Sequence, residues 1–112
     1  MTAGLNELWG GILDSLLLDI THQTATLVVR VPIGEHETSH RLEVRGIHDF
    51  RFANAIPGPW SYAELTEIRM DTLPTDRMRL AVMLWSEQAS LIMEADAAML
   101  DGVELMVRND GC

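Results

Sequence analysis

The sequence predicts a mainly β fold: an antiparallel sandwich or half-open barrel of seven or eight short strands with a short N-terminal helix. Apolar and polar residues alternate along most of the chain, which is typical of half-buried strands. Turn residues interrupt this alternation at short intervals, and no helical pattern of about 10–15 residues separates the strands, which disfavours a parallel sheet. The length of 112 residues predicts one domain, 1–112, with an adequate core.

The expected helix rests on apolar residues at the i, i+3, i+4, i+7 spacing of one helical face, namely Leu5, Leu8, Trp9 and Ile12. Thr2 is the expected N-cap and Gly10 the expected stop. From Asp14 onward the period of the pattern changes to two, which predicts strands.

Each predicted strand has a set of residues on one face: Leu16, Leu18 and Ile20; Leu27, Val29, Val31 and Ile33; His40, Leu42 and Val44; His48, Phe50 and Phe52; Ile68, Met70 and Thr72; Met78, Leu80, Val82 and Leu84; and a strand over 89–95. Gly46 interrupts the pattern as a β-bulge would. Ser61 and Glu64 have capping-box spacing, which predicts a brief helical turn over 60–65. Alternation from Leu100 to Val107 is weak and leaves the C-terminal element open.

All eight basic residues are arginines, and the net charge is −9. The absence of lysine excludes Schiff-base catalysis and a P-loop lysine. Residues 30–79 are nearly neutral, whereas the two flanking segments are acidic. This balance disfavours nucleic-acid binding and favours a cationic partner. The arginines are expected to form cross-strand ion pairs with carboxylates on the outer face of the hairpins.

The single cysteine, Cys112, excludes an intramolecular disulfide, which is typical of a reducing compartment. The first eleven residues contain Glu7 and no basic residue, so a signal peptide is not expected. No apolar run approaches the roughly 20 residues that span a bilayer. We therefore expect a cytoplasmic protein that does not bind membranes.

Catalytic patterns are missing from the sequence. No serine lies in a G-x-S-x-G elbow, and the glycines form neither a dinucleotide fingerprint nor a P-loop. His48 and Asp49 are neighbours on a predicted strand and therefore point to opposite faces. The chain is expected to be no enzyme and to need no cofactor.

Two clusters are candidate sites. His36, His40 and His48, with carboxylates nearby, are candidate ligands of a metal ion or a small ligand. The alternative is a solvated hairpin tip. Trp60, Tyr62 and Trp85 are candidate partner-binding residues, because aromatic side chains often anchor interfaces, and the alternative is that they belong to the core.

Several short patterns occur in a characteristic order: Leu8-Trp9-Gly10, Asp14-Ser15, an alternating hairpin at 24–45, Gly46-Ile47, Phe50-Arg51-Phe52, Glu67-Ile68 and a strand over 80–84. Over residues 8–95 this order resembles the YxiG-like domains and certain small bacterial immunity proteins. The resemblance implies a non-enzymatic binding role, such as neutralising a cognate toxin, and it implies no catalytic residue.

Three hypotheses follow from the sequence. The first is a protein-binding domain with a basic protein partner. The second is a metal- or small-ligand-binding domain that uses the histidines. The third is a structural subunit of a homo-oligomer such as a homodimer, because the strand that contains Ala81, Met83 and Trp85 is apolar on both faces.

Overall fold

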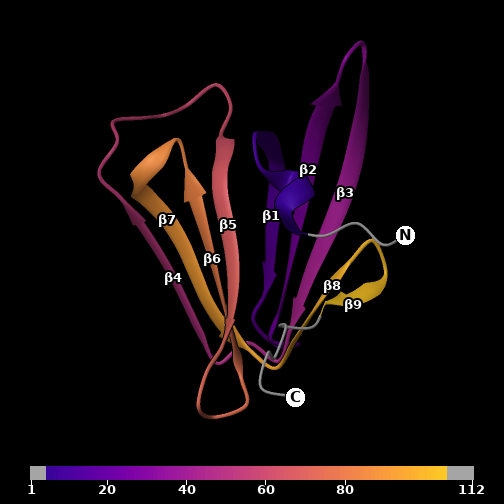
Figure 1. Cartoon of the computed structure of the whole chain (residues 1–112). Helices are drawn as coiled ribbons and strands as arrows, with labels where there is room; N and C mark the ends of the chain where they lie inside the picture. The colour runs from indigo at the N-terminus through magenta and orange to yellow at the C-terminus, as the bar shows by residue number, and fades with distance from the viewer. Residues whose placement is uncertain (1–4, 106–112) are drawn as a thin grey trace.

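A computed structural model describes residues 5–105, with only the backbone of Glu87, and it confirms the mainly antiparallel β fold. The described elements are η1 (Leu5–Leu8), β1 (Gly11–Asp19), β2 (Thr24–Ile33), β3 (His36–Arg45), β4 (Asp49–Asn54), β5 (Glu64–Thr72), β6 (Met78–Leu84), β7 (Ser86–Ala95), β8 (Ala97–Leu100) and β9 (Val103–Leu105). The nine strands form one sheet in the order β4-β7-β6-β5-β1-β2-β3-β8-β9 (Figure 1). No helix in this part of the chain is long and apolar enough to cross a membrane.

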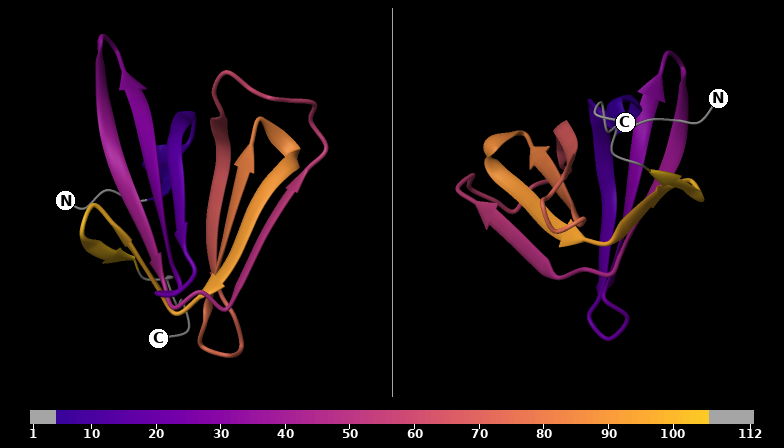
Figure 2. Two further views of the ribbon diagram at one scale, coloured as in Figure 1. Left: turned by 180° about the vertical axis from the view of Figure 1, so that it is seen from behind. Right: turned by 60° about the horizontal axis from the view of Figure 1, so that its bottom comes forward.

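The sheet is bent into two halves, β4-β7-β6-β5 and β1-β2-β3-β8-β9, which diverge from corners at the bottom of the molecule (Figure 2). Two connections form these corners, residues 46–48 between β3 and β4 and Asp96 between β7 and β8. At the top, β1 and β5 pair only through Gly11 with Leu65 and Ile12 with Glu64. The fold is therefore a sandwich made from one continuous sheet.

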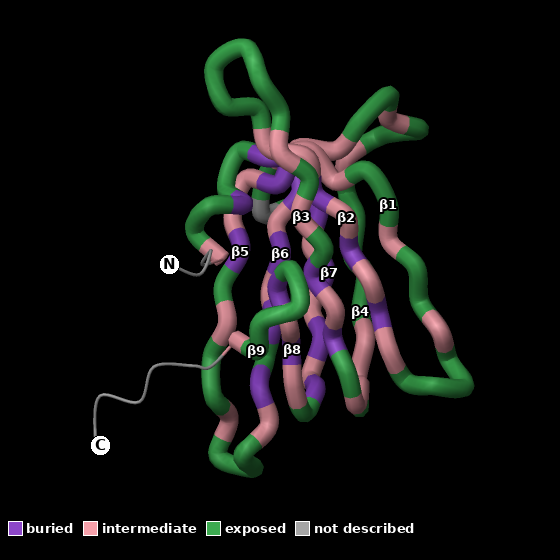
Figure 3. The backbone as a smooth tube through the Cα atoms, turned by 90° about the vertical axis from the view of Figure 1, so that its right-hand side faces the viewer, coloured by how far each residue is buried: buried purple, intermediate pink, exposed green. Residues whose placement is uncertain are grey.

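The core lies between the two halves and is formed by the residues that alternate along the strands. Leu27, Val29, Leu42 and Val44 of one half and Leu80, Val82 and Met93 of the other are at most 1 % exposed. Buried positions alternate with more accessible ones along the strands, as Figure 3 shows. The predicted apolar faces of these strands are confirmed.

The predicted N-terminal helix is reduced to the single 3-10 turn η1. Ile12 belongs to β1 instead, because β1 pairs with both β2 and β5 at this point. Gly10 does end the turn, with a φ of 80° that glycine adopts without strain. The predicted N-cap, Thr2, lies outside the described residues.

Gly46 is not a β-bulge but the first residue of the corner between β3 and β4, with a φ of 65°. A Cβ atom at this position would collide with the Asp96 carboxylate of the other corner. The close approach of the two corners, rather than an extra residue in a ladder, therefore requires the glycine.

The predicted helical turn over 60–65 is absent. Glu64 is the first residue of β5, where it pairs with Ile12, and its carbonyl oxygen accepts a 2.9 Å hydrogen bond from the backbone N–H of Trp85. These strand contacts replace the capping box. The C-terminal element that the sequence left open is the β8–β9 hairpin, whose two turn residues, Asp101 and Gly102, both have positive φ.

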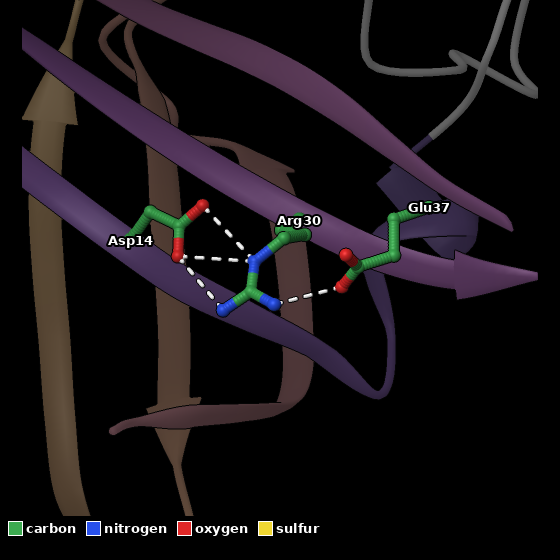
Figure 4. A network of polar contacts seen from close by, with 3 residues as sticks. All are labelled: Asp14, Arg30 and Glu37. Atoms are coloured by element: carbon green, nitrogen blue, oxygen red, sulfur yellow. Dashed lines mark hydrogen bonds and ion pairs between the residues drawn. The ribbon is translucent and has the colours of Figure 1, made fainter. Parts of the chain in front are cut away.

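The prediction of cross-strand ion pairs is confirmed for one arginine, Arg30, which forms two of them (Figure 4). Arg30 of β2 donates from Nη2 to Asp14 of β1 at 3.2 Å and from Nη1 to Glu37 of β3 at 2.7 Å. The hydrogen bonds to Glu37 and then Asp14 raise the pKa of the Arg30 guanidinium above its usual value.

The other arginine ion pairs of the described residues join neighbours two positions apart on one strand, rather than two strands: Arg45 with Glu43, Arg51 with Asp49, and Arg69 with Glu67. The expectation of cross-strand pairing is therefore wrong for these three. Side chains at i and i+2 share one face of a strand, so their charged groups reach one another without a neighbouring strand.

Candidate functional site

Two strand edges on one side of the sandwich have no strand beside them in the described part of the chain. β1 is paired with β2 along its length, but its other edge meets β5 only at Gly11 and Ile12, with one further hydrogen bond from Leu13 N–H to Ala63 O. β4 is paired with β7 and is the last strand of its half. We call the space between β1 and β4 the open side.

The inward-facing side chains on these two strands remain accessible although their cross-strand partners are buried. Phe52 of β4 is 54 % exposed, whereas its partner Leu91 on β7 is 2 % exposed. Leu18 of β1 is 37 % exposed, whereas its partner Ala25 on β2 is 1 % exposed. Core-facing side chains are therefore exposed at the open side, because no further strand of the described chain covers them there.

Two hollows lie in series along the open side. The first has a volume of about 270 Å³ and is lined only by apolar residues: Leu13, Leu16, Phe50, Phe52, Trp60, Ala63, Leu84 and Leu91. The second has a volume of about 220 Å³ and is lined by Leu18, Asp19, Ile20, Gln23, Ile47, His48, Asp49 and Phe50. Phe50 lines both hollows, so they adjoin each other, and we call the two together the groove, with an apolar end and an acidic end.

The three aromatic candidates from the sequence gather at the apolar end of this groove. Tyr62 packs edge-to-face on Trp85 with ring centroids 4.8 Å apart, and Trp60 does the same at 6.5 Å. Trp60 also lines the apolar hollow and donates from its indole nitrogen to Pro57 O at 3.0 Å. Tyr62 is 53 % exposed, so the cluster is neither core nor isolated surface but the rim of the groove.

Trp85 occupies an unusual backbone conformation. Its φ is 68°, a left-handed value that is rare for a bulky side chain and costs of order 1–3 kcal/mol. Trp85 is the only residue between β6 and β7, so the tight reversal there sets its φ and directs its ring toward Trp60 and Tyr62. The strands on either side of Trp85, β6 and β7, therefore hold the strained residue and with it the aromatic rim in place.

The charged residues among the described lining of the groove are both acidic. Asp49 accepts a hydrogen bond from Arg51 at 2.9 Å. Asp19 accepts hydrogen bonds from the backbone N–H of His22, from the Thr21 hydroxyl and from the His22 ring, in that order of effect, and these lower its pKa below the usual value. The Asp19 carboxylate is therefore charged at neutral pH.

The structure does not bring the candidate metal ligands together. His36 lies at the exposed start of β3, His40 Nδ1 lies 2.7 Å from Asp101 Oδ2, and His48 Nε2 lies 2.9 Å from Asp96 Oδ1. Among residues 5–105, no group of three or more histidine, cysteine, aspartate or glutamate side chains is arranged to hold a metal ion. Cys112 lies outside the described residues.

Sequence reasoning named the aromatic rim but missed the leucines and phenylalanines of the groove. One signal was available: Leu16, Leu17 and Leu18 make β1 apolar on both faces, and Leu17 on the outer face is 71 % exposed. An apolar strand of this kind usually has a protected edge, and beyond Leu13 no backbone hydrogen bond from residues 5–105 protects the edge of β1. The sequence matches no known protein-family model and no curated protein.

Proposed function

We propose that this chain is a non-enzymatic protein-binding domain that receives its partner in the groove between β1 and β4. The exposure of Phe52 and Leu18, beside cross-strand partners that are almost fully buried, carries this proposal. Apolar surface of this kind, rimmed by aromatic side chains and acidic groups, is typical of an interface rather than of a free surface.

The charge of the chain supports a basic partner. The net charge is −9, and the charged groups lining the groove are Asp19 and Asp49. A positively charged protein would be steered toward this surface and held by it. Neutralisation of a basic toxin, which the sequence resemblance implies, is a narrower form of the same proposal.

Site-specific cross-linking tests the proposal. A photo-reactive amino acid is placed at Phe52 or Tyr62 of the groove, or at Ile33 on the distant β2–β3 hairpin as a matched control, because these side chains are 54 %, 53 % and 58 % exposed. We expect one discrete protein adduct from the first two positions and none from Ile33 in lysate of the source cells. Equal adducts from all three positions, or none from any, would contradict the proposal.

A further inference from the structure

At the open side, both the backbone edge of β1 and the side chains beside it are left uncovered by the described residues. Beyond Leu13, no backbone hydrogen bond from the described chain satisfies the free edge of β1, and β1 runs to Asp19. An unpaired edge of this length presents N–H and C=O groups that an extended segment of another chain can pair with. A helix or a folded surface would leave those groups unmatched.

The groove has two hollows that differ in chemistry. The apolar hollow ends at Leu16 and Phe50, and the second hollow begins at Leu18 and Phe50. Leu16 and Leu18 are two positions apart on β1 and therefore face the same side, as alternate side chains of a strand added beside β1 would. The second hollow contains Asp19 and Asp49, which match a cation at the end of that strand.

A second copy of this chain is a poor occupant. Its own β1 carries the acidic residues Asp14 and Asp19, and each copy carries a net charge of −9. Like charges placed together across an interface are unfavourable. The exposed Asp49–Arg51 pair, in contrast, is weak enough to exchange Arg51 for a cation of the partner.

We propose that the partner binds as an extended strand added to the free edge of β1, with alternate apolar side chains in the two hollows and an arginine or lysine beside Asp19 and Asp49. This inference rests on the proposed function and specifies the conformation and chemistry of the partner segment. Backbone hydrogen bonds to β1 supply the register, and the hollows select the side chains.

Selection from a displayed library of random ten-residue peptides against the whole chain tests this inference. We expect the enriched peptides to have apolar residues at every second position and a basic residue at one end. Enrichment of apolar residues at helical spacing, or of acidic residues, would overturn it. If no peptide is enriched while Phe52 still cross-links a protein, strand addition is wrong and the proposed function stands.

Backbone methylation of an enriched peptide provides the sharper measurement. Methyl groups on alternate amides block one edge of a strand and leave the other edge unchanged. We expect one methylated series to bind at least about tenfold more weakly, because several backbone hydrogen bonds are lost, and the other series to bind as the parent does. Equal binding of both series would show that the groove captures side chains without strand pairing.

Variants of the chain locate the peptide. Asp49→Asn is expected to weaken a peptide that ends in arginine several-fold and to leave the glutamine version of that peptide unaffected. Leu18→Ser is expected to weaken both peptides, and Ile33→Ser on the distant hairpin neither. Displacement of the peptide by a fatty acid, or dimerisation of the free chain in sedimentation, would instead identify a lipid or a second copy as the occupant.

Discussion

β1 and β5 meet at two residue pairs and then separate, so each has a long edge that the other leaves unpaired. The chain covers the edge of β5 itself: Leu8 of η1 is fully buried, and the Trp9 indole donates to Ile68 O at 3.2 Å. The edge of β1 receives no such cover from residues 5–105, although Leu16 and Leu18 face the core from it.

The described chain therefore closes one of these two edges with its own residues and leaves the other accessible. The same short sequence before β1 supplies an apolar side chain and an indole donor to one edge and leaves the other free. At the far end of β5, Thr72 lines a hollow of about 220 Å³ together with Glu104 and Leu105 of β9. We infer that a partner covers the remaining side.

The largest loss of stability is expected when the buried side chain of η1, which covers the edge of β5, is removed. Leu8→Ala removes a fully buried side chain and is expected to lower the free energy of unfolding by about 2–5 kcal/mol. Leu17→Ala on the outer face of β1, where the side chain is 71 % exposed, is expected to change it by less than about 0.5 kcal/mol. Urea unfolding of both variants checks this, and similar losses would refute the difference between the buried side chain of η1 and the exposed side chain of β1.

A substitution at the open side is expected to weaken the binding of an apolar ligand much more than it lowers the free energy of unfolding. Phe52→Ser removes a 54 % exposed ring and is expected to cost less than about 1 kcal/mol of stability, while most of the binding of a fluorescent apolar dye is lost. Ile33→Ser, at a residue that is 58 % exposed on the hairpin tip, is expected to retain dye binding. A dye titration with both variants distinguishes a groove from scattered exposed residues.

The strands were predictable because a period of two depends on each residue's own polarity. The long-range partners were not, because nothing local says that Gly11 and Ile12 pair with β5 or that Gly46 meets Asp96. The helical spacing of Leu5 to Ile12 was therefore misleading. The pairing of β1 with β2 and β5 outweighed the weak local preference of this segment for a helix.

The candidate site was likewise predictable in its residue types and not in its long-range contacts. Trp60, Tyr62 and Trp85 were recognisable by residue type, and only the fold shows that they share one rim. The histidines looked like a cluster in sequence, but His40 lies on β3 and His48 in the corner between β3 and β4, and each pairs with its own aspartate. The groove depends on which edges stay unpaired, and that property belongs to the whole sheet.

The indole of Trp9 is a smaller test of the closed side. Trp9→Phe keeps an aromatic ring, loses the donor to Ile68 O, and is expected to cost about 0.5–1.5 kcal/mol of stability. Trp60→Phe loses a donor to Pro57 O in an exposed loop and is expected to cost less, because water replaces that bond. Thermal unfolding of the pair compares the two indoles, and equal costs would mean that Trp9 does not protect the β5 edge.

The smallest effect concerns the β8–β9 hairpin, which lies opposite the far end of β5 and is held to β3 by Asp101. Burial raises the pKa of Asp101. Hydrogen bonds from the Arg41 backbone N–H and the His40 ring lower it by more than burial raises it, so the pKa lies below its usual value. A lowered pKa stabilises the folded state above the unfolded pKa of about 3.9, and this stabilisation is lost as the pH falls through the folded pKa.

Asp101→Asn keeps an oxygen for the Arg41 N–H and a residue type that tolerates the positive φ, so it removes mainly the charge. Because Asp101 is 41 % exposed, the expected loss at pH 7 is no more than about 1 kcal/mol. The gap between the two proteins is expected to close as the pH falls below about 4 in urea unfolding at stepped pH. A gap that stays constant into acid would show that Asp101 holds the hairpin by shape alone, and dye binding at the open side should be unchanged in either case.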